Sequence, residues 1–426
     1  MATLKKTGAL LCCSLILSTA IAQQQLTVDD CYALARENYP LTQQRGLIEK
    51  SRDYSLENAV KGYLPQLNIV GMATYQSDVV SLPIPDNLGI DIPALSKDQY
   101  KIYGEVSQTI YDGGNVRLQR KATKTAALVQ EQSLEVNLYA LRDRVGQLFF
   151  GILLFDRQLE QNALRKQDLE NGLKTMRAAE DNGTALHSDA DEVQVELLNA
   201  GQQEVELNAA RNAYAEMLSL VIGRAVTDSV ILLPSDKQAP SMQKANVNRP
   251  EMRLYDLQKQ NLDVQKSQLN MLNTPKLSLF LQGGYGKPGL NMLSNDFEFY
   301  YIGGVRFSWN IPGLYTLGKE KKNIGLQQQM LDAQRETFVF NTELQVSQQH
   351  HEVQKLQELI NNDSEIVQLR TSIKNTAKVQ LDNGVMTSHD YIARVNAENQ
   401  ARQALAIHEI NLMQTLYNYR TAIGEK

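Results

Sequence analysis

The chain has 426 residues, a formal net charge of −5 and a mean hydropathy of −0.36. The length suggests two or three domains, and the charge gives no support for nucleic-acid binding or for a basic membrane-binding surface. The low hydropathy and the single tryptophan exclude a polytopic helical membrane protein.

The chain begins with a segment that has the form of a secretory signal peptide. Two lysines precede an apolar core at residues 9–17, and an Ala-Ile-Ala cleavage site follows at 20–22. We therefore expect residues 1–22 to be removed on export. Cys31 is then the only cysteine left, which excludes an internal disulfide and a thiolate metal cluster.

The rest of the chain repeats itself. Four short landmarks recur in the same order, and the last two recur at the same offset of 201 residues. We expect a first repeat over 23–223, an inter-repeat linker over 224–247 with a short strand at 230–233, and a second repeat over 248–426. The landmarks are Asn38-Tyr39-Pro40 and Asn248-Arg249-Pro250, Pro65-Gln66-Leu67 and Pro275-Lys276-Leu277, Asp181-Asn182-Gly183 and Asp382-Asn383-Gly384, and Ile222-Gly223 and Ile423-Gly424.

In the first repeat, helical spacing predicts a helix over 28–62 that is broken at Pro40. Alternating apolar and polar residues then predict a β-hairpin over about 64–112. A helical hairpin follows over about 115–222. It consists of a continuous helix from 115 to 180, roughly 100 Å long, a turn at an Asn-Gly pair, and a return helix from 189.

The second repeat has the same order of elements. A β-hairpin is expected over about 276–311 and a helical hairpin over about 317–423, with the return helix starting at 390. Each β-hairpin is apolar on one face and mostly polar on the other. In the second repeat, Val305 and Phe307 face opposite to Arg306.

Four strands in one chain cannot close a transmembrane barrel, because the smallest bacterial barrels have about eight. An open sheet in lipid would leave edge N–H and C=O groups without hydrogen bonds. Either the hairpins pack on a soluble core, or several chains pool their strands. Three chains would supply twelve strands.

The doubled landmarks, with the strand exit Tyr111-Asp112-Gly113-Gly114 and the two Asn-Gly turns, resemble the TolC family of outer-membrane efflux proteins. The resemblance covers residues 26–426. It implies a mainly α fold with a transmembrane β part: long helical hairpins form a trimeric periplasmic α-barrel, and two β-hairpins per chain contribute to a shared twelve-stranded outer-membrane β-barrel.

The resemblance also implies a function. The chain would be a homotrimeric exit duct in outer-membrane lipid, serving a tripartite efflux or type I secretion system. It would passively conduct substrates delivered by an inner-membrane pump, of the RND or ABC class, through a periplasmic adaptor (a membrane fusion protein). The strand loops at 77–98 and 287–298 would face outside the cell.

In this family the two helical turns form the periplasmic tip. Asp189 and Asp390 each follow a tip glycine by six residues and match acidic positions near the channel constriction. The family has a second acidic residue one turn further on, where this chain has Ala393. The residues implied to contact the adaptor are Asn182, Gly183, Thr184, Asn383, Gly384 and Val385.

Each of these positions also has a purely structural interpretation. Acidic residues are favoured in the first turn of a helix by capping and by the helix dipole, and a glycine is favoured where a helix ends. Aromatic residues near the strand ends suit membrane interfaces, although ordinary strand packing also accounts for them. These are Tyr75, Tyr100, Tyr285, Tyr300, Tyr301 and Trp309.

No enzyme signature is present in the sequence. His350 and His351 are adjacent, so their side chains diverge on a helix and do not form a metal site. The Gly-Gly pairs at 283–284 and 303–304 lie within strands and are not phosphate loops. We expect no catalytic residues, no metal and no cofactor.

Two other classes of protein remain open. A periplasmic adaptor would have one helical hairpin flanked by β-rich domains, whereas here both kinds of hairpin are duplicated. A periplasmic coiled-coil scaffold would not need two alternating β-hairpins with long polar loops. The sequence identifies neither the exported substrate nor the class of pump.

Overall fold

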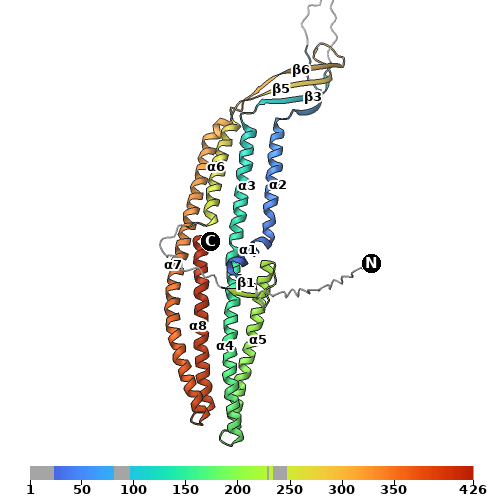
Figure 1. Cartoon of the computed structure of the whole chain (residues 1–426). Coiled ribbons are helices and arrows are strands. Elements are labelled where there is room, and N and C mark those ends of the chain that lie inside the picture. The colour runs from blue at the N-terminus through green and yellow to red at the C-terminus, as the bar shows by residue number, and fades with distance from the viewer. Residues whose placement is uncertain (1–23, 81–95, 228–229, 234–246, 426) are drawn as a thin grey trace, which may run out of the picture. The chain divides into compact units, whose positions relative to one another are not determined.

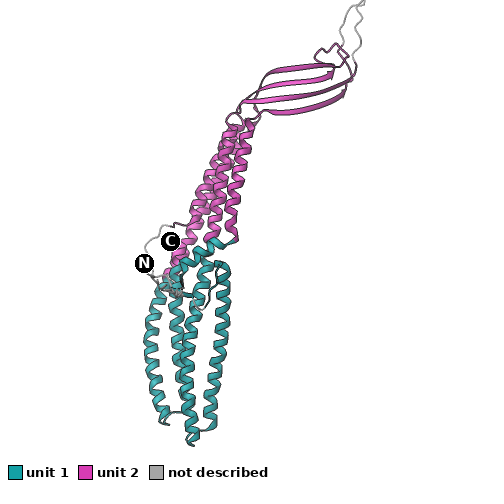
Figure 2. Ribbon diagram, turned by 45° about the vertical axis from the view of Figure 1, so that its right-hand side comes forward, with its two compact units in different colours: residues 1–39, 141–241, 351–418 teal, residues 40–140, 242–350, 419–426 magenta. Residues whose placement is uncertain are grey.

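The computed structural model describes residues 24–80, 96–227, 230–233 and 247–425. The expected signal peptide, the centre of the first strand loop and most of the inter-repeat linker lie outside these residues. The chain forms two compact units, each with residues from both repeats (Figure 2). Unit 1 comprises residues 1–39, 141–241 and 351–418, and unit 2 comprises residues 40–140, 242–350 and 419–426.

Unit 2 contains a four-stranded antiparallel sheet in the order β2-β3-β5-β6 (Figure 1). The two β-hairpins of the expected fold are both present. Pairing of β3 with β5 joins the two hairpins into one sheet that contains strands of both repeats. The strands are β2 (Gln66–Tyr75), β3 (Asp98–Tyr111), β5 (Lys276–Lys287) and β6 (Glu298–Ser308).

The register of the sheet separates apolar from polar residues. Residues opposite one another on neighbouring strands share a face, and one such row consists of Leu67, Val106 and Leu281. The apolar face is open: the side chains of Ile69 and Tyr301 are 74% and 78% exposed. The next row, on the other face, contains Asn68, Glu105 and Gln282.

The helices of unit 2 continue from the strands. After β3, the carboxylate of Asp112 accepts the N–H groups of Gly114 and Val116, at 2.8 Å each, and so starts α3 (Asn115–Tyr139). Gly113 and Gly114 have φ of +70° and +84°, which favours glycine at the tight exit from the strand.

Polar contacts hold the helices of unit 2 side by side. Arg45 on α2 (Gln44–Val60) pairs with Glu135 on α3. The α3 residue Thr125 donates its hydroxyl to Asn261 on α6 (Pro250–Leu272) at 3.2 Å. Lys259 of α6 pairs with Asp332 on α7 (Gly313–Asp382) at 2.8 Å. The short 3₁₀ turns η1 (Pro40–Gln43) and η2 (Lys61–Tyr63) flank α2.

Unit 1 contains helices from both repeats. They are α1 (Val28–Asn38), α4 (Leu141–Asp181), α5 (His187–Ile222), the end of α7 and most of α8 (Ser388–Ile423). The expected short strand is present as β4 (Val230–Leu233). It pairs in parallel with β1 (Gln24–Thr27), which the sequence analysis did not predict.

The rings of two tyrosines on α8 pack against glycines on α4. A Cβ built on Gly172 would lie 2.8 Å from Cε1 of Tyr391, and one built on Gly146 would lie 2.7 Å from Cε1 of Tyr417. The hydroxyl of Tyr391 donates to the carbonyl oxygen of Asp168, and that of Tyr417 donates to the carbonyl oxygen of Arg142, at 3.3 Å each. Each carbonyl lies four residues before the glycine that its tyrosine contacts. Close approach of the rings therefore requires glycine at both positions.

One expectation about the helices is wrong. The helix expected to run without a break from 115 to 180 is interrupted at Ala140, between α3 and α4, whereas α7 is continuous over 70 residues. The break follows Tyr139, whose hydroxyl donates to the carbonyl oxygen of Thr421 at 2.7 Å and whose ring lies 5.4 Å from the guanidinium of Arg249. The return helices begin two residues earlier than expected, because their caps lie at Leu186 and Thr387.

Candidate functional site

The turn after α4 has a specific hydrogen-bond pattern. Gly183 has φ of +71°, the N–H of Thr184 donates to the carbonyl of Ala179 at 2.8 Å, and the N–H of Gly183 donates to Glu180 at 2.8 Å. This is the Schellman ending of a helix, in which a left-handed residue lets the next amides satisfy the last carbonyls.

The turn after α7 has the same pattern. Gly384 has φ of +69°, and Val385 N–H donates to Gln380 at 2.9 Å. Both asparagines donate their side-chain amide to the carbonyl four residues earlier, at 2.7 Å for Asn182 and 2.8 Å for Asn383. All six residues expected at the adaptor contact are exposed in unit 1, including the apolar side chain of Val385 at 78%.

The two aspartates expected at the constriction cap the return helices. Asp189 accepts the N–H of Leu186 at 3.0 Å. Asp390 accepts the hydroxyl of Thr387 at 2.9 Å, and the N–H of Asp390 donates back to that hydroxyl at 3.1 Å. Capping therefore accounts for the local position of both carboxylates. Ala393, one turn further on, is exposed on the same side of α8.

A polar link between the repeats lies beside these caps, and the sequence analysis did not find it. The hydroxyl of Ser388 on α8 donates to Glu192 at 3.2 Å and to Asp189 at 3.4 Å, both on α5. His389 Nδ1 lies 2.8 Å from the carboxylate of Glu192. Only the three-dimensional contact reveals this link, because its members are about 200 residues apart in the chain.

His187 and His389, beside the two helical turns, both face carboxylates. The hydrogen bond to Glu192 raises the pKa of His389 above its usual value. His187 lies 2.7 Å from Glu180 and 3.5 Å from Asp191, and the hydrogen bond with Glu180 raises the pKa of this imidazole as well. In mild acid these two imidazoles therefore carry more positive charge than two unperturbed histidines would.

Further along unit 1, Arg165 on α4 connects the two helical hairpins. Its guanidinium donates to Glu196 at 2.8 Å and to Gln203 at 3.3 Å on α5, and to Asn396 at 3.1 Å on α8. Three helices from both repeats therefore share one largely buried charge, which ties their relative positions together.

On the sheet of unit 2, the polar face carries a charged pair. Both terminal nitrogens of Arg306 on β6 donate hydrogen bonds to the carboxylate of Glu105 on β3, at 2.8 and 3.0 Å. Its guanidinium lies 4.6 Å from the ring centre of Phe280 on the intervening strand β5. The alternation in the sequence put Arg306 on the polar face but gave no sign that it meets Glu105.

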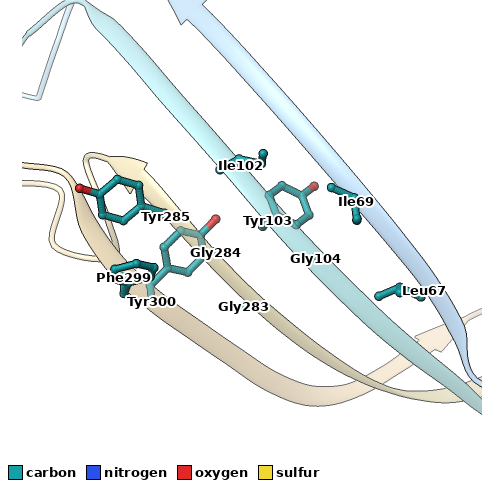
Figure 3. Close-up of a pocket in the computed structure, with 10 residues that line it drawn as sticks. All are labelled: Leu67, Ile69, Ile102, Tyr103, Gly104, Gly283, Gly284, Tyr285, Phe299 and Tyr300. Carbon is teal, nitrogen blue, oxygen red and sulfur yellow. The ribbon is translucent and has the colours of Figure 1, made fainter.

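The opposite, apolar face has a shallow hollow of about 480 Å³ (Figure 3). Gly104 and Gly283 lie opposite one another there and leave space between larger apolar side chains. A neighbouring glycine, Gly284, is required by close packing, because a Cβ at this position would lie 2.6 Å from Cβ of Tyr103 and 3.0 Å from Cζ of Tyr300. The larger residues around the hollow include Leu67, Ile69, Ile102, Tyr285 and Phe299.

Five of the six aromatic residues expected at a membrane interface are exposed in unit 2, and the sixth, Tyr300, is half-buried. Tyr75, Tyr100, Tyr285, Tyr301 and Trp309 are between 39% and 79% exposed. Tyr111 and Tyr315, which the sequence analysis did not single out, are 54% and 80% exposed at the helix end of the strands.

No helix in the part of the chain that the structure describes has the length and apolarity needed to cross a membrane. Among the same residues, no group of three or more His, Cys, Asp or Glu side chains is placed to hold a metal ion.

Comparison with known proteins gives a consistent result. Residues 32–224 match the model of a family described as outer membrane efflux protein. No curated protein matches the chain.

Several solved outer-membrane channels share the fold. VceC of Vibrio cholerae is 12% identical, with a TM-score of 0.67 over 93% of this chain and 96% of that one. CmeC of Campylobacter jejuni is 13% identical, with a TM-score of 0.65 over 93% and 85% of the two chains. MtrE of Neisseria gonorrhoeae is 14% identical, with a TM-score of 0.65 over 93% and 89%.

Proposed function

The chain belongs to the outer membrane efflux protein family, and we propose that it is the exit duct of a tripartite efflux or type I secretion system. The protein is located in the outer membrane. In our proposal it acts as a homotrimer without catalysing a reaction. It passively conducts substrates that an inner-membrane RND or ABC pump delivers through a periplasmic adaptor.

The observation that carries this proposal is the open sheet of unit 2. Its apolar face exposes large side chains, and each of its outer strands, β2 and β6, pairs with only one neighbour among the described residues. Lipid would cover the apolar face, but the unpaired strand edges could not remain open in lipid. Two further copies would pair both edges and bring the total to twelve strands.

The helices of unit 1 support the same assembly. Val193 and Ala200 on α5 are fully buried, whereas Val195, Leu198 and Val205 are 54%, 60% and 70% exposed. At 3.6 residues per turn, these exposed residues lie on roughly the opposite side of the helix. A helix with two apolar sides needs two partners. The chain supplies α4 for the buried side, and in our proposal another copy covers the exposed side.

The functional residues at the tip are part of the proposal. We assign the turns around Gly183 and Gly384 to adaptor docking, because their side chains are exposed and their backbones are held by the same hydrogen bonds. We assign Asp189 and Asp390 to the constriction. Three copies of Asp390 around a narrow axis would disfavour anions, and this role is compatible with capping.

The alternative of a periplasmic scaffold or adaptor explains less. Such a protein would have to cover the apolar face of the sheet with other protein. It would also need an occupant for both open strand edges.

The test uses the full-length protein expressed in a Gram-negative host. We expect it in the outer-membrane fraction, as a detergent-soluble trimer by light scattering, with a steady conductance in planar bilayers. Leu198→Glu should shift the protein toward monomer, whereas the matched change Leu164→Glu, at an exposed leucine on α4, should not. A monomer that is soluble without detergent and does not conduct would overturn the proposal.

A further inference from the structure

The two β-hairpins pair in the same register, residue for residue. Leu67 lies opposite Val106 in the first hairpin, and Leu277 lies opposite Phe307 in the second. The first strands are thus related by an offset of 210 residues, and the second strands by the 201 residues that also relate the landmarks. Glu105 and Arg306 therefore occupy equivalent positions in the two repeats, with opposite charges.

The contact between them spans the junction of the repeats. Glu105 lies opposite Gln282 on β5, which lies opposite Ile302 on β6. Arg306 is four residues, or two pleat periods, beyond Ile302 on the same face, and it reaches back over Phe280 to the carboxylate.

The junction between two copies can be derived from this one. Under the repeat offsets, the pairing of Glu105 with Gln282 becomes a pairing of Arg306 with Met72 on β2 of the next copy. The displacement between Arg306 and Glu105 of the next copy is then the same as the displacement between Arg306 and Glu105 within one chain. Each arginine would lie between two glutamates.

We propose that three copies form a ring of six alternating side chains, Glu105 and Arg306, on the polar, lumen-facing side of the shared barrel. The ring has no net charge and keeps the barrel from preferring cations or anions at this level. This inference rests on the proposed function, because only a closed barrel turns the polar face into a lumen.

The dimensions allow such a ring to act on permeating ions. Twelve strands spaced about 4.8 Å apart and tilted by about 45° give a backbone radius of roughly 13 Å. The Debye length at 0.1 M salt is about 10 Å. Charges on the wall are therefore felt across much of the lumen.

The first experiment measures reversal potentials of single channels in a salt gradient near 0.1 M. Arg306→Gln leaves three glutamates and should shift the permeability ratio toward cations, by about twofold or more. Glu105→Gln leaves three arginines and should shift it toward anions. The exchange Glu105→Arg with Arg306→Glu should restore the wild-type ratio. Gln282→Ala, a neutral change in the same row, is the matched control.

Equal ratios in all variants, or shifts of the same sign in both single variants, would overturn the ring. These outcomes differ from failure of the proposed function, in which the wild-type protein itself would not conduct.

A second experiment tests the register between copies. The repeat offsets convert the observed pair Gly104 and Gly283 into Val305 opposite Ala73 of the next copy. In a Cys31→Ser background, the double variant Val305→Cys with Ala73→Cys should form disulfide-linked trimers on oxidation. Val305→Cys with Tyr75→Cys, displaced by two residues on the same face, should not. Linkage through position 75 instead would overturn the ring while leaving the conductance intact.

Discussion

At the scale of single residues, the two repeats meet where a tyrosine ring of one helix packs against a glycine of another. Tyr391 is 1% exposed and seats on Gly172, about 220 residues earlier in the chain. A tyrosine in the first turn of one helix and a glycine inside another are ordinary residues in isolation. Periodicity identifies the buried side of each helix but not its partner. Asp189 and Asp390 were found by their distance from the tip glycines. Glu192 and Ser388, which link them across the repeats, had no such signal.

The Gly172 contact leads to a stability prediction. In a helix interior, Gly→Ala alone stabilises by up to about 1 kcal/mol. At Gly172 the added methyl would press on the Tyr391 ring, so Gly172→Ala should destabilise the protein by about 1–3 kcal/mol. Gly201→Ala on α5, where nothing lies within 4 Å, should raise the unfolding temperature. Thermal unfolding in detergent measures both, and equal shifts in the two variants would contradict the prediction.

The link between His389 and Glu192 leads to a pH prediction. The partners that raise the pKa of His389 are Glu192 on α5 and, to a smaller extent, its neighbour Asp390. Because the folded pKa lies above the ordinary value of 6.5, the stabilisation is complete below that pH. It is lost as pH rises through the folded pKa. Hydrogen exchange of residues 388–391, corrected for intrinsic rates, should therefore show more protection at pH 6 than at pH 8.

In His389→Gln this difference in protection should disappear, while His187→Gln, whose partner Glu180 lies on α4, should retain it. A difference that persists unchanged in His389→Gln would assign the effect to another group.

At the scale of elements, the sequence was most informative where local chemistry decides the structure. The Asn-Gly pairs predicted both helical reversals, and the period-two alternation predicted which strand residues share a face. It was least informative where distant segments compete. The break at Ala140 follows a tyrosine held by Thr421, and β1 forms only because β4 is available to pair with it.

The turn after α7 allows a prediction at this scale. Gly384 has a left-handed conformation that costs a residue with a side chain about 1–2 kcal/mol. Gly384→Ala should therefore loosen the end of α7. The loosening would be measured as faster hydrogen exchange of two amides: that of Val385, which donates to Gln380, and that of residue 384, which donates to Leu381. Gly325→Ala, inside α7 with nothing within 4 Å, should leave these amides unchanged. Unchanged exchange in Gly384→Ala would show that the turn does not depend on glycine.

At the scale of the whole molecule, the duplication in the sequence predicted the composition of the fold but not its division into compact units. Each unit takes segments from both repeats, because neither repeat can bury its own helix and strand surfaces alone. The polar face of the sheet shows the same limit. The sequence placed Glu105 and Arg306 on that face. Only the pairing of β3 with β5 reveals that these two residues are in contact.

The two tyrosine and glycine contacts constrain how α8 can move against α4. Tyr391 and Tyr417 are 26 residues apart, and so are Gly146 and Gly172. Translation of α8 along α4 by even one residue, about 1.5 Å, would lift both rings out of their notches at once and drive them toward positions that carry Cβ atoms. The two contacts between α8 and α4 therefore oppose sliding of one helix along the other. Rotation of α8 about the line that joins the two glycine contacts would keep both rings in place, so relative motion of the two helices is expected to be rotation.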